Sequence, residues 1–107
     1  MAVGHYLRSK RIFFWKNPTG GYFDTARKAF RKQVSPYAIN GAPDYIAVIY
    51  GVFIGFEVKS PTGRQSDSQK AFEDALRTAG GMYFIIKSLE DLIIALQQIE
   101  VALEIKI

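Results

Sequence analysis

The sequence predicts an α/β domain in which a mixed four-stranded sheet is flanked by helices, in the order α-β-β-β-α-β-α. Two neighbouring stretches, residues 45–50 and 52–59, have the length and β-branched character of strands. Two later stretches have a helical spacing of apolar residues and begin at serines that cap helices. The chain of 107 residues is 49% hydrophobic and 22% charged, so we predict a single packed domain over residues 1–107.

The N-terminal third begins with a helix and a strand. Residues 2–9 place apolar side chains on one helical face, and residues 11–16 form a strand that ends at an Asn-Pro turn. The aromatic residues Phe13, Phe14 and Trp15 fit either the core, which we favour, or stacking on an unpaired base. Residues 24–34 fit either a basic helix or an irregular insertion.

The two central strands bring charged residues to one end of the sheet. Period-two alternation puts Glu57 and Lys59 on one face of the second strand, whose other face is apolar. Asp44 stands at the start of the neighbouring antiparallel strand, after Gly41, which permits the turn, while Gly55 is expected to keep the site face open for a backbone or phosphate. Two carboxylates and a lysine at sheet ends suit metal-assisted hydrolysis of a phosphodiester.

The C-terminal half continues as helix, strand and helix. Ser66 caps a helix to about residue 79, residues 82–87 form a strand, and Ser88 caps the last helix. Two roles are predicted for Gln69, and they are not mutually exclusive. It closes the capping box that Ser66 opens, or it points inward from the first turn and reaches the site, which is the reading we favour.

Composition excludes several classes of site. Cysteine is absent, which excludes disulfides, thiolate metal sites and a cysteine nucleophile, and the single histidine, His5, excludes multi-histidine sites. No signal-peptide pattern opens the chain, and the apolar runs stop short of the roughly 20 residues that span a membrane. We therefore expect an intracellular, cytoplasmic protein with no membrane association.

Charge is unevenly distributed along the chain. Residues 1–37 hold eight basic residues and one acidic residue, giving +7, whereas residues 38–107 hold six basic and nine acidic residues, giving −3. A basic third beside a carboxylate site suits a polyanion such as DNA. Without the carboxylate site, we would interpret the basic residues of this third as an ordinary solvated face.

The motif residues occur in a recognisable order: Gly41-x-Pro43-Asp44, Gly55-x-Glu57-x-Lys59-Ser60, Gly63-x-Gln65-Ser66-x-x-Gln69 and Gly80-Gly81-x-Tyr83. In this respect the chain resembles the virus-type replication-repair nuclease (VRR-NUC) family of the PD-(D/E)xK superfamily, most clearly from about residue 41 to residue 92. The resemblance implies a restriction-endonuclease-like core and an Mg²⁺- or Mn²⁺-dependent endonuclease that cuts branched DNA. Because small stand-alone members look like Holliday-junction resolvases, it also implies a four-way junction as substrate.

The resemblance also implies roles for individual residues. Asp44, Glu57 and the backbone carbonyl of Val58 would hold the metal, Lys59 would position the attacking water, and Gln69 would be functional. The residues expected to contact DNA are Arg27, Lys28, Arg31 and Lys32 in the basic third, and Ser60, Arg64 and Gln65 around the turn after the second central strand. Relatives carry a glutamate in the first helix, but residues 1–6 contain no acid. Either the chain as given starts inside that helix or the site works without this carboxylate, so one or two metals stay open.

Two further expectations concern assembly and rival functions. One site cuts one strand, so symmetric cleavage of a junction requires a homodimer, and the apolar segment 89–107 fits either a dimer interface or packing under the domain's own sheet. The alternatives to a junction-cutting nuclease are a non-catalytic DNA-binding or assembly module on a degenerate nuclease fold, and a nicking or sequence-specific endonuclease.

Overall fold

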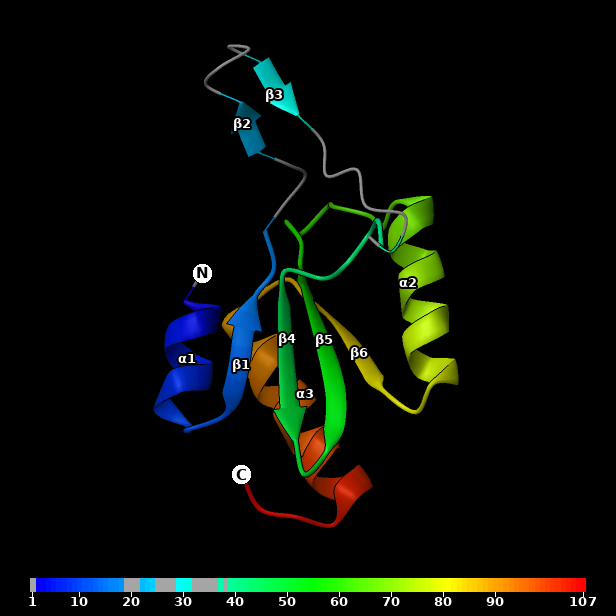
Figure 1. Cartoon of the computed structure of the whole chain (residues 1–107). Coiled ribbons are helices and arrows are strands. Elements are labelled where there is room, and N and C mark those ends of the chain that lie inside the picture. Colours follow the sequence, from blue (N-terminus) through cyan, green and yellow to red (C-terminus); the bar gives the residue numbers. More distant parts are fainter. Residues whose placement is uncertain (1, 19–21, 25–28, 32–36, 38) are drawn as a thin grey trace.

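The computed structural model describes residues 2–18, 22–24, 29–31, 37 and 39–107 (Figure 1). Among these residues, three helices and a four-stranded mixed sheet form an α/β fold with the predicted order α-β-β-β-α-β-α, and a short two-stranded sheet is added after the first strand. The elements are α1 (Val3–Ser9), β1 (Phe13–Lys16), β2 (Tyr22–Asp24), β3 (Ala29–Arg31), β4 (Tyr45–Ile49), β5 (Val52–Val58), α2 (Asp67–Thr78), β6 (Met82–Ile86) and α3 (Leu89–Leu103).

The main sheet has the strand order β1-β4-β5-β6. β4 pairs antiparallel with both β1 and β5, whereas β6 runs parallel to β5. Tyr50 and Gly51, with φ of 48° and 79°, form the tight turn between β4 and β5. The parallel pair needs a crossover, which α2 supplies on one side of the sheet, while α1 and α3 lie on the other side (Figure 1).

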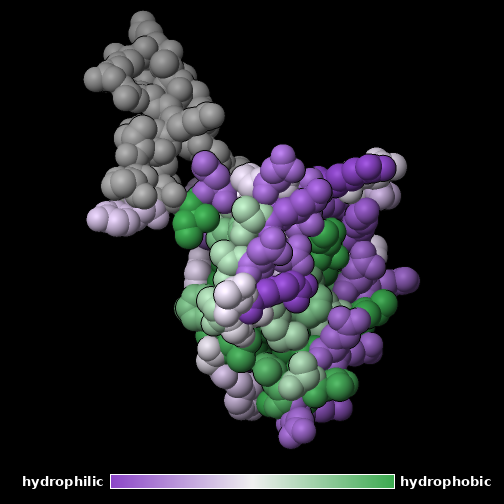
Figure 2. Space-filling view, turned by 90° about the vertical axis from the view of Figure 1, so that its right-hand side faces the viewer, coloured by the Kyte–Doolittle hydropathy of each residue, from purple (hydrophilic) through white to green (hydrophobic). Residues whose placement is uncertain are grey.

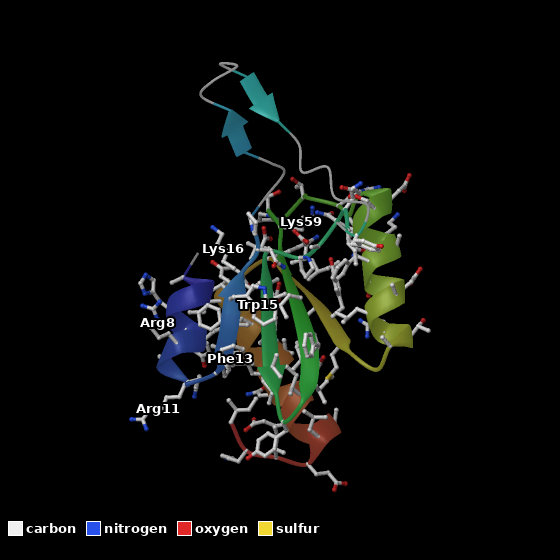
Figure 3. All side chains as sticks on the ribbon, in the orientation of Figure 1. Arg8, Arg11, Phe13, Trp15, Lys16 and Lys59 are labelled. Atoms are coloured by element: carbon white, nitrogen blue, oxygen red, sulfur yellow. The ribbon has the colours of Figure 1, made fainter. Side chains whose placement is uncertain are left out.

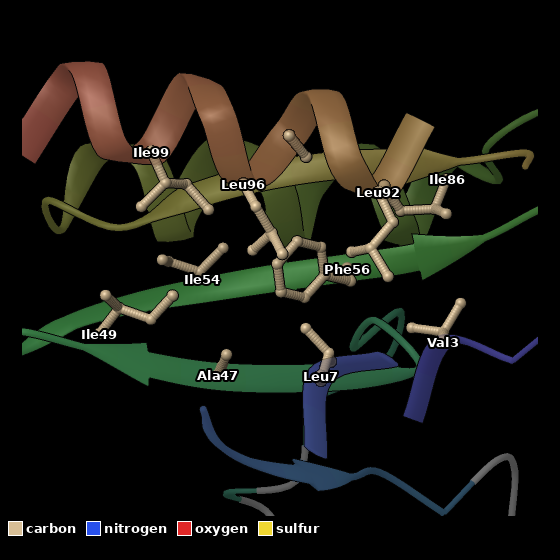
Figure 4. Close-up of a cluster of buried hydrophobic side chains, with 11 residues drawn as sticks. Val3, Leu7, Ala47, Ile49, Ile54, Phe56, Ile86, Leu92, Leu96 and Ile99 are labelled. Carbon is tan, nitrogen blue, oxygen red and sulfur yellow. The ribbon is translucent and has the colours of Figure 1, made fainter. Parts of the chain in front are cut away.

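The core lies between the sheet and the helices α1 and α3 (Figure 4). Alternation along β4 and β5 turns Ala47, Ile54 and Phe56 toward these helices. Phe56 is fully buried and stacks on Phe84, with 6.0 Å between the ring centroids. The sheet also contributes Ile49 and Ile86, and the helices contribute Val3, Leu7, Leu92, Ala95, Leu96 and Ile99.

The apolar C-terminal segment packs mainly under the domain's own sheet. Beyond the buried face of α3, Leu103, Ile105 and Ile107 pack against the core as well. Leu89, Ile94 and Val101 are left exposed on α3. No helix in the described part of the chain is both long and apolar enough to cross a membrane.

The helix considered over residues 24–34 is wrong where the structure describes this stretch. Ala29–Arg31 is the strand β3 and pairs antiparallel with Tyr22–Asp24, while residues 25–28 and 32–36 lie outside the described residues. A helix here would have placed Arg27 near Arg31, and Lys28 near Lys32, at the i,i+4 spacing where like charges are destabilising. Aromatic residues at 22, 23 and 30 favour strands instead.

Candidate functional site

Asp44 and Glu57 meet at one end of the sheet. Tyr45 of β4 pairs antiparallel with Phe56 of β5. Asp44, just before Tyr45, and Glu57, just after Phe56, therefore lie opposite each other on the same face of the sheet. Asp44 Oδ2 accepts a hydrogen bond of 2.7 Å from the backbone N–H of Val58. This bond fixes the Asp44 carboxylate against the end of β5.

The backbone that carries Asp44 is held from β1. Asn17 follows this strand, and its backbone N–H donates to the carbonyl of Asp44 at 2.8 Å. Its side-chain Nδ2 donates to the carbonyl of Pro43 at 2.9 Å. The Pro-Asp pair is therefore positioned by two strands rather than by its own loop.

Glu57 is the only charged side chain among the described residues that is buried, with 4% of its surface exposed. Its Oε2 has no hydrogen-bond partner. Burial above all, together with the neighbouring Asp44 carboxylate, raises the pKa of Glu57 to about 7, although Lys59 and the Tyr83 hydroxyl oppose the rise. A buried carboxylate without a full set of partners is costly, and a bound cation would offset that cost.

Lys59 and Val58 complete this end of the sheet. The Lys59 N–H donates to Ile86 of β6 at 3.0 Å, and its side chain is half-buried near Glu57, whose pKa its charge lowers. Figure 3 shows Lys59 at the upper end of the sheet. Since the N–H and C=O of a strand residue point the same way, the Val58 carbonyl lies on the side of Asp44. A pocket of about 270 Å³ at this end of the sheet is lined by Val3, Lys16, Asp44, Tyr45 and Val58; it opens beside α1 and includes neither Glu57 nor Lys59.

Tyr83 belongs to the same face, although it was not among the predicted site residues. It pairs with Gly55 in the β5–β6 register, and its hydroxyl is buried without a hydrogen-bond partner. Burial above all, together with the charges of Glu57, Glu73 and Asp44, raises its pKa to about 12, although Gln65 opposes the rise. The sequence signal was its place two residues after the Gly80-Gly81 pair, on the face shared with Glu57.

The side chain of Gln65 hydrogen-bonds to α2 instead of pointing to solvent. Its Nε2 donates to Glu73 Oε1 at 2.9 Å, and Arg77 Nε donates to Glu73 Oε2 at 2.9 Å. Arg77 also donates to the carbonyl of Tyr83 at 2.8 Å. These contacts join α2 to β6 beside the carboxylates, and they lower the pKa of Glu73 against the effect of its burial.

Gln69 makes the contacts of a capping residue. Its Oε1 accepts from the Ser66 N–H at 2.9 Å, and Ser66 Oγ accepts from the Gln69 N–H at 3.2 Å. The predicted capping box is confirmed, with helix α2 beginning at Asp67. A role of this half-buried side chain in the chemistry stays a prediction.

Two glycines serve close packing around the site. Gly41 has φ of +80°, and a Cβ there would clash with the backbone of Ser68 in α2, so the loop lies directly on the helix. The expectation that Gly55 keeps the face open is wrong. A Cβ at Gly55 would lie 2.9 Å from the Pro43 ring and 3.2 Å from Tyr83, because these side chains fill the space.

The residues predicted to bind DNA fall into two groups. Ser60 and Arg64 are exposed on the turn after β5, where the Gly63 N–H donates to the Ser60 carbonyl at 3.0 Å. In the basic segment, Arg31 lies in β3 opposite Tyr22. Arg27, Lys28 and Lys32 lie outside the described residues.

The core assignment of the aromatic run is wrong for two of its three members. Phe14 packs against the core, but Phe13 is 68% exposed and Trp15 is 39% exposed. Alternation on β1 turns Phe13 and Trp15 to the side of α2, and this helix lies beside β6 without reaching β1 (Figures 1 and 3). The view of Figure 2 shows hydrophilic side chains across the upper part of the α2 side and hydrophobic ones below.

The donor set fits one divalent cation. Within the described residues, no group of three or more His, Cys, Asp or Glu side chains converges, and the first turn of α1 has no acid. Two carboxylates and one backbone carbonyl are the few hard oxygens with which Mg²⁺ is bound while it keeps several waters. The unpartnered Oε2 of Glu57 offers a ligand atom that nothing else in the described structure uses.

No protein-family model matches the chain, and no curated protein is detectably similar to it.

Proposed function

We propose that the protein is a metal-dependent endonuclease of the VRR-NUC type, with a restriction-endonuclease-like core, that hydrolyses phosphodiester bonds in branched DNA such as a four-way junction. The observation that carries this proposal is the buried Glu57 carboxylate, unpartnered at Oε2, beside Asp44. A structural ion pair would satisfy both oxygens, whereas a metal ligand is kept ready for its ion.

Each residue of the site has a task in this reaction. Asp44, Glu57 and the Val58 carbonyl would hold the ion, with Asp44 kept in place by the Val58 N–H. Bound Mg²⁺ or Mn²⁺ supplies Lewis-acid polarisation of the phosphate and a water of lowered pKa. Lys59 orients the attacking water and neutralises negative charge that develops at phosphorus.

The rival with an observation in its favour is a non-catalytic DNA-binding or assembly module. The absence of an acid in the first turn of α1 supports it. Against it stands the cost of keeping a buried carboxylate that no longer holds a metal, since a change to glutamine would remove that cost. The nicking and sequence-specific alternatives have no observation of this kind behind them.

Symmetric cleavage of a junction would need two copies of the site. We include a homodimer in the proposal because one site cuts one strand. Exposed apolar side chains are available on the outer edge of the sheet and on α3, where Ile85 and Ile94 line a pocket of about 220 Å³.

The test is incubation of the protein with a labelled four-way junction in Mg²⁺, in Mn²⁺ and in EDTA. We expect cleavage with either metal and none with EDTA. A linear duplex of the same arm sequence serves as the control and should be cut much more slowly. A protein that binds the junction but cuts no DNA with either metal would support the non-catalytic module instead.

A further inference from the structure

Three aromatic rings lie exposed together on the face of the sheet that carries Glu57. Phe13 is 68% exposed, Trp15 39% and Phe53 50%. The rings meet edge to face, with centroids 6.0 Å apart for Phe13 and Trp15 and 6.3 Å apart for Trp15 and Phe53. Contiguous exposed apolar patches on a protein surface are often binding sites.

The strand register places these rings directly next to the carboxylates. Trp15 pairs with Ile46, which pairs with Gly55, and this row is two residues along the strands from Asp44 and Glu57. Two residues of a strand span about 7 Å. The row of Phe13 and Phe53 follows one such step further on.

The Trp15 ring is also tied to the site by hydrogen bonds. Its Nε1 donates to Asn17 Oδ1 at 2.9 Å. The same Asn17 donates to the carbonyls of Pro43 and Asp44. The indole is therefore held in a fixed orientation relative to the Asp44 carboxylate.

The segment that carries two of the rings is basic in sequence. Residues 2–18 contain Arg8, Lys10, Arg11 and Lys16 and no acidic residue. Arg8 belongs to α1 on the other side of the sheet, and alternation turns Lys16 away from Trp15, whereas Lys59, at the upper end of the sheet in Figure 3, shares the face of Glu57 and Phe53. Exposed aromatic rings near a cationic side chain are a combination that proteins use for single-stranded nucleic acid, because bases stack on the rings and phosphates pair with the cation.

We propose that Phe13, Trp15 and Phe53 form a stacking platform for unpaired nucleobases next to the phosphodiester that is cut. This inference rests on the proposed function and deepens it, because it names the feature of branched DNA that the site recognises. Bases within a duplex have both faces covered by their neighbours, whereas bases freed at a branch point or flap expose a face to stack. Stacking is tolerant of sequence, so the platform would select structure rather than base identity.

Trp15 is the only tryptophan of the chain and reports on the platform directly. The experiment titrates the full chain, in EDTA to prevent cleavage, with a 12-nucleotide thymidine oligonucleotide and with an abasic oligonucleotide of the same length. We expect the thymidine oligonucleotide to quench Trp15 emission and to bind roughly fivefold or more tightly than the abasic one. Equal binding and equal emission with both would overturn the platform.

Matched variants separate stacking from general hydrophobic contact. The double variant Phe13→Leu/Phe53→Leu keeps apolar bulk at two exposed positions but removes both rings, and it should bind thymidine roughly fivefold or more weakly with the abasic affinity unchanged. Tyr50→Leu is the control, because Tyr50 is 78% exposed at the opposite end of β4 from Asp44, and it should bind as the wild type does. Unchanged thymidine binding in the double variant would overturn the platform.

The remaining outcomes distinguish this inference from the proposed function. Base-dependent quenching in a protein that cuts no DNA would support the platform and overturn the nuclease. Cleavage of a junction by a protein whose Trp15 emission does not depend on the presence of bases would support the nuclease and overturn the platform. A change of emission with protein concentration alone, together with a dimer in sedimentation, would assign the rings to a contact between copies and overturn the platform.

Discussion

The two faces of the sheet differ in what covers them and in what they carry. The face toward α1 and α3 is closed and apolar, with Ile54 and Phe56 fully buried. The face toward α2 carries Glu57 buried with an unpartnered oxygen, and it leaves Phe53 half exposed on the same strand. One strand, β5, thus stabilises the fold with every second residue and builds the candidate site with the residues between.

The largest expected effect is the loss of cleavage when a carboxylate on the face toward α2 is removed. Asp44→Ala or Glu57→Ala should abolish cleavage, because each removes a proposed metal ligand, and should leave DNA binding intact or tighter, because each removes negative charge near phosphate. The measurements are single-turnover cleavage of a labelled junction and binding in EDTA. Asp74→Ala, which removes an exposed carboxylate from α2, is the control and should cut normally. Near wild-type cleavage by both site variants would contradict the assignment of the ligands.

Removal of Lys59 should separate turnover from metal binding on the same face. Lys59→Ala should slow cleavage by roughly 10²- to 10⁴-fold, because the water and the developing charge lose their cationic partner. Calorimetry with Mn²⁺ should still show binding, since the ligands remain. Lost Mn²⁺ binding would instead give Lys59 a structural role.

Substitutions on the closed face, toward α1 and α3, should lower the stability of the protein. Phe56→Ala removes a fully buried ring that stacks on Phe84 and should lower the free energy of unfolding by roughly 3–5 kcal/mol. Phe53→Ala, on the same strand but half exposed, should cost much less. Urea unfolding of the two variants measures the contrast. Equal losses would mean that the two faces contribute alike to the packing.

The smallest expected effect is a pH dependence of stability in the metal-free protein. The pKa of Glu57 is raised from 4.5 to about 7 on folding, so between these values the folded protein keeps a proton that the unfolded chain has lost. Stability should therefore fall as pH rises from 4.5 to about 7, by about 3 kcal/mol at most, and level off above that. Glu57→Gln should remove this slope and be the more stable protein at pH 8. A wild-type curve that is flat over this range would contradict the buried, proton-binding carboxylate.

Several elements could be predicted from the sequence because their signals are local. The capping box at Ser66 and the cap at Ser88 mark the starts of α2 and α3, and Gly51 marks the turn after β4. A turn this short fixes the register of β4 against β5, and alternation then fixes the faces. For this reason the sequence alone predicts that Asp44 and Glu57 meet.

Other features depended on the path of α2. Alternation puts Phe13 and Trp15 on one face of β1, but only the position of the helix beside β6 leaves that part of the face uncovered. The filling of the space at Gly55 by Pro43 and Tyr83 comes from the same packing. In the β2–β3 segment, helical and strand signals competed, and pairing between two short strands decided the outcome.

The sequence by itself determined the order of the elements and the convergence of Asp44, Glu57 and Lys59, because alternation, caps and a tight turn act over a few residues. Only the tertiary structure decided that Glu57 is buried with an unpartnered oxygen, that its pKa is raised, and that three aromatic rings stay exposed beside it. The physical reason is that burial depends on which distant element covers a face, and the pKa of a carboxyl follows from that burial and from its neighbours in space.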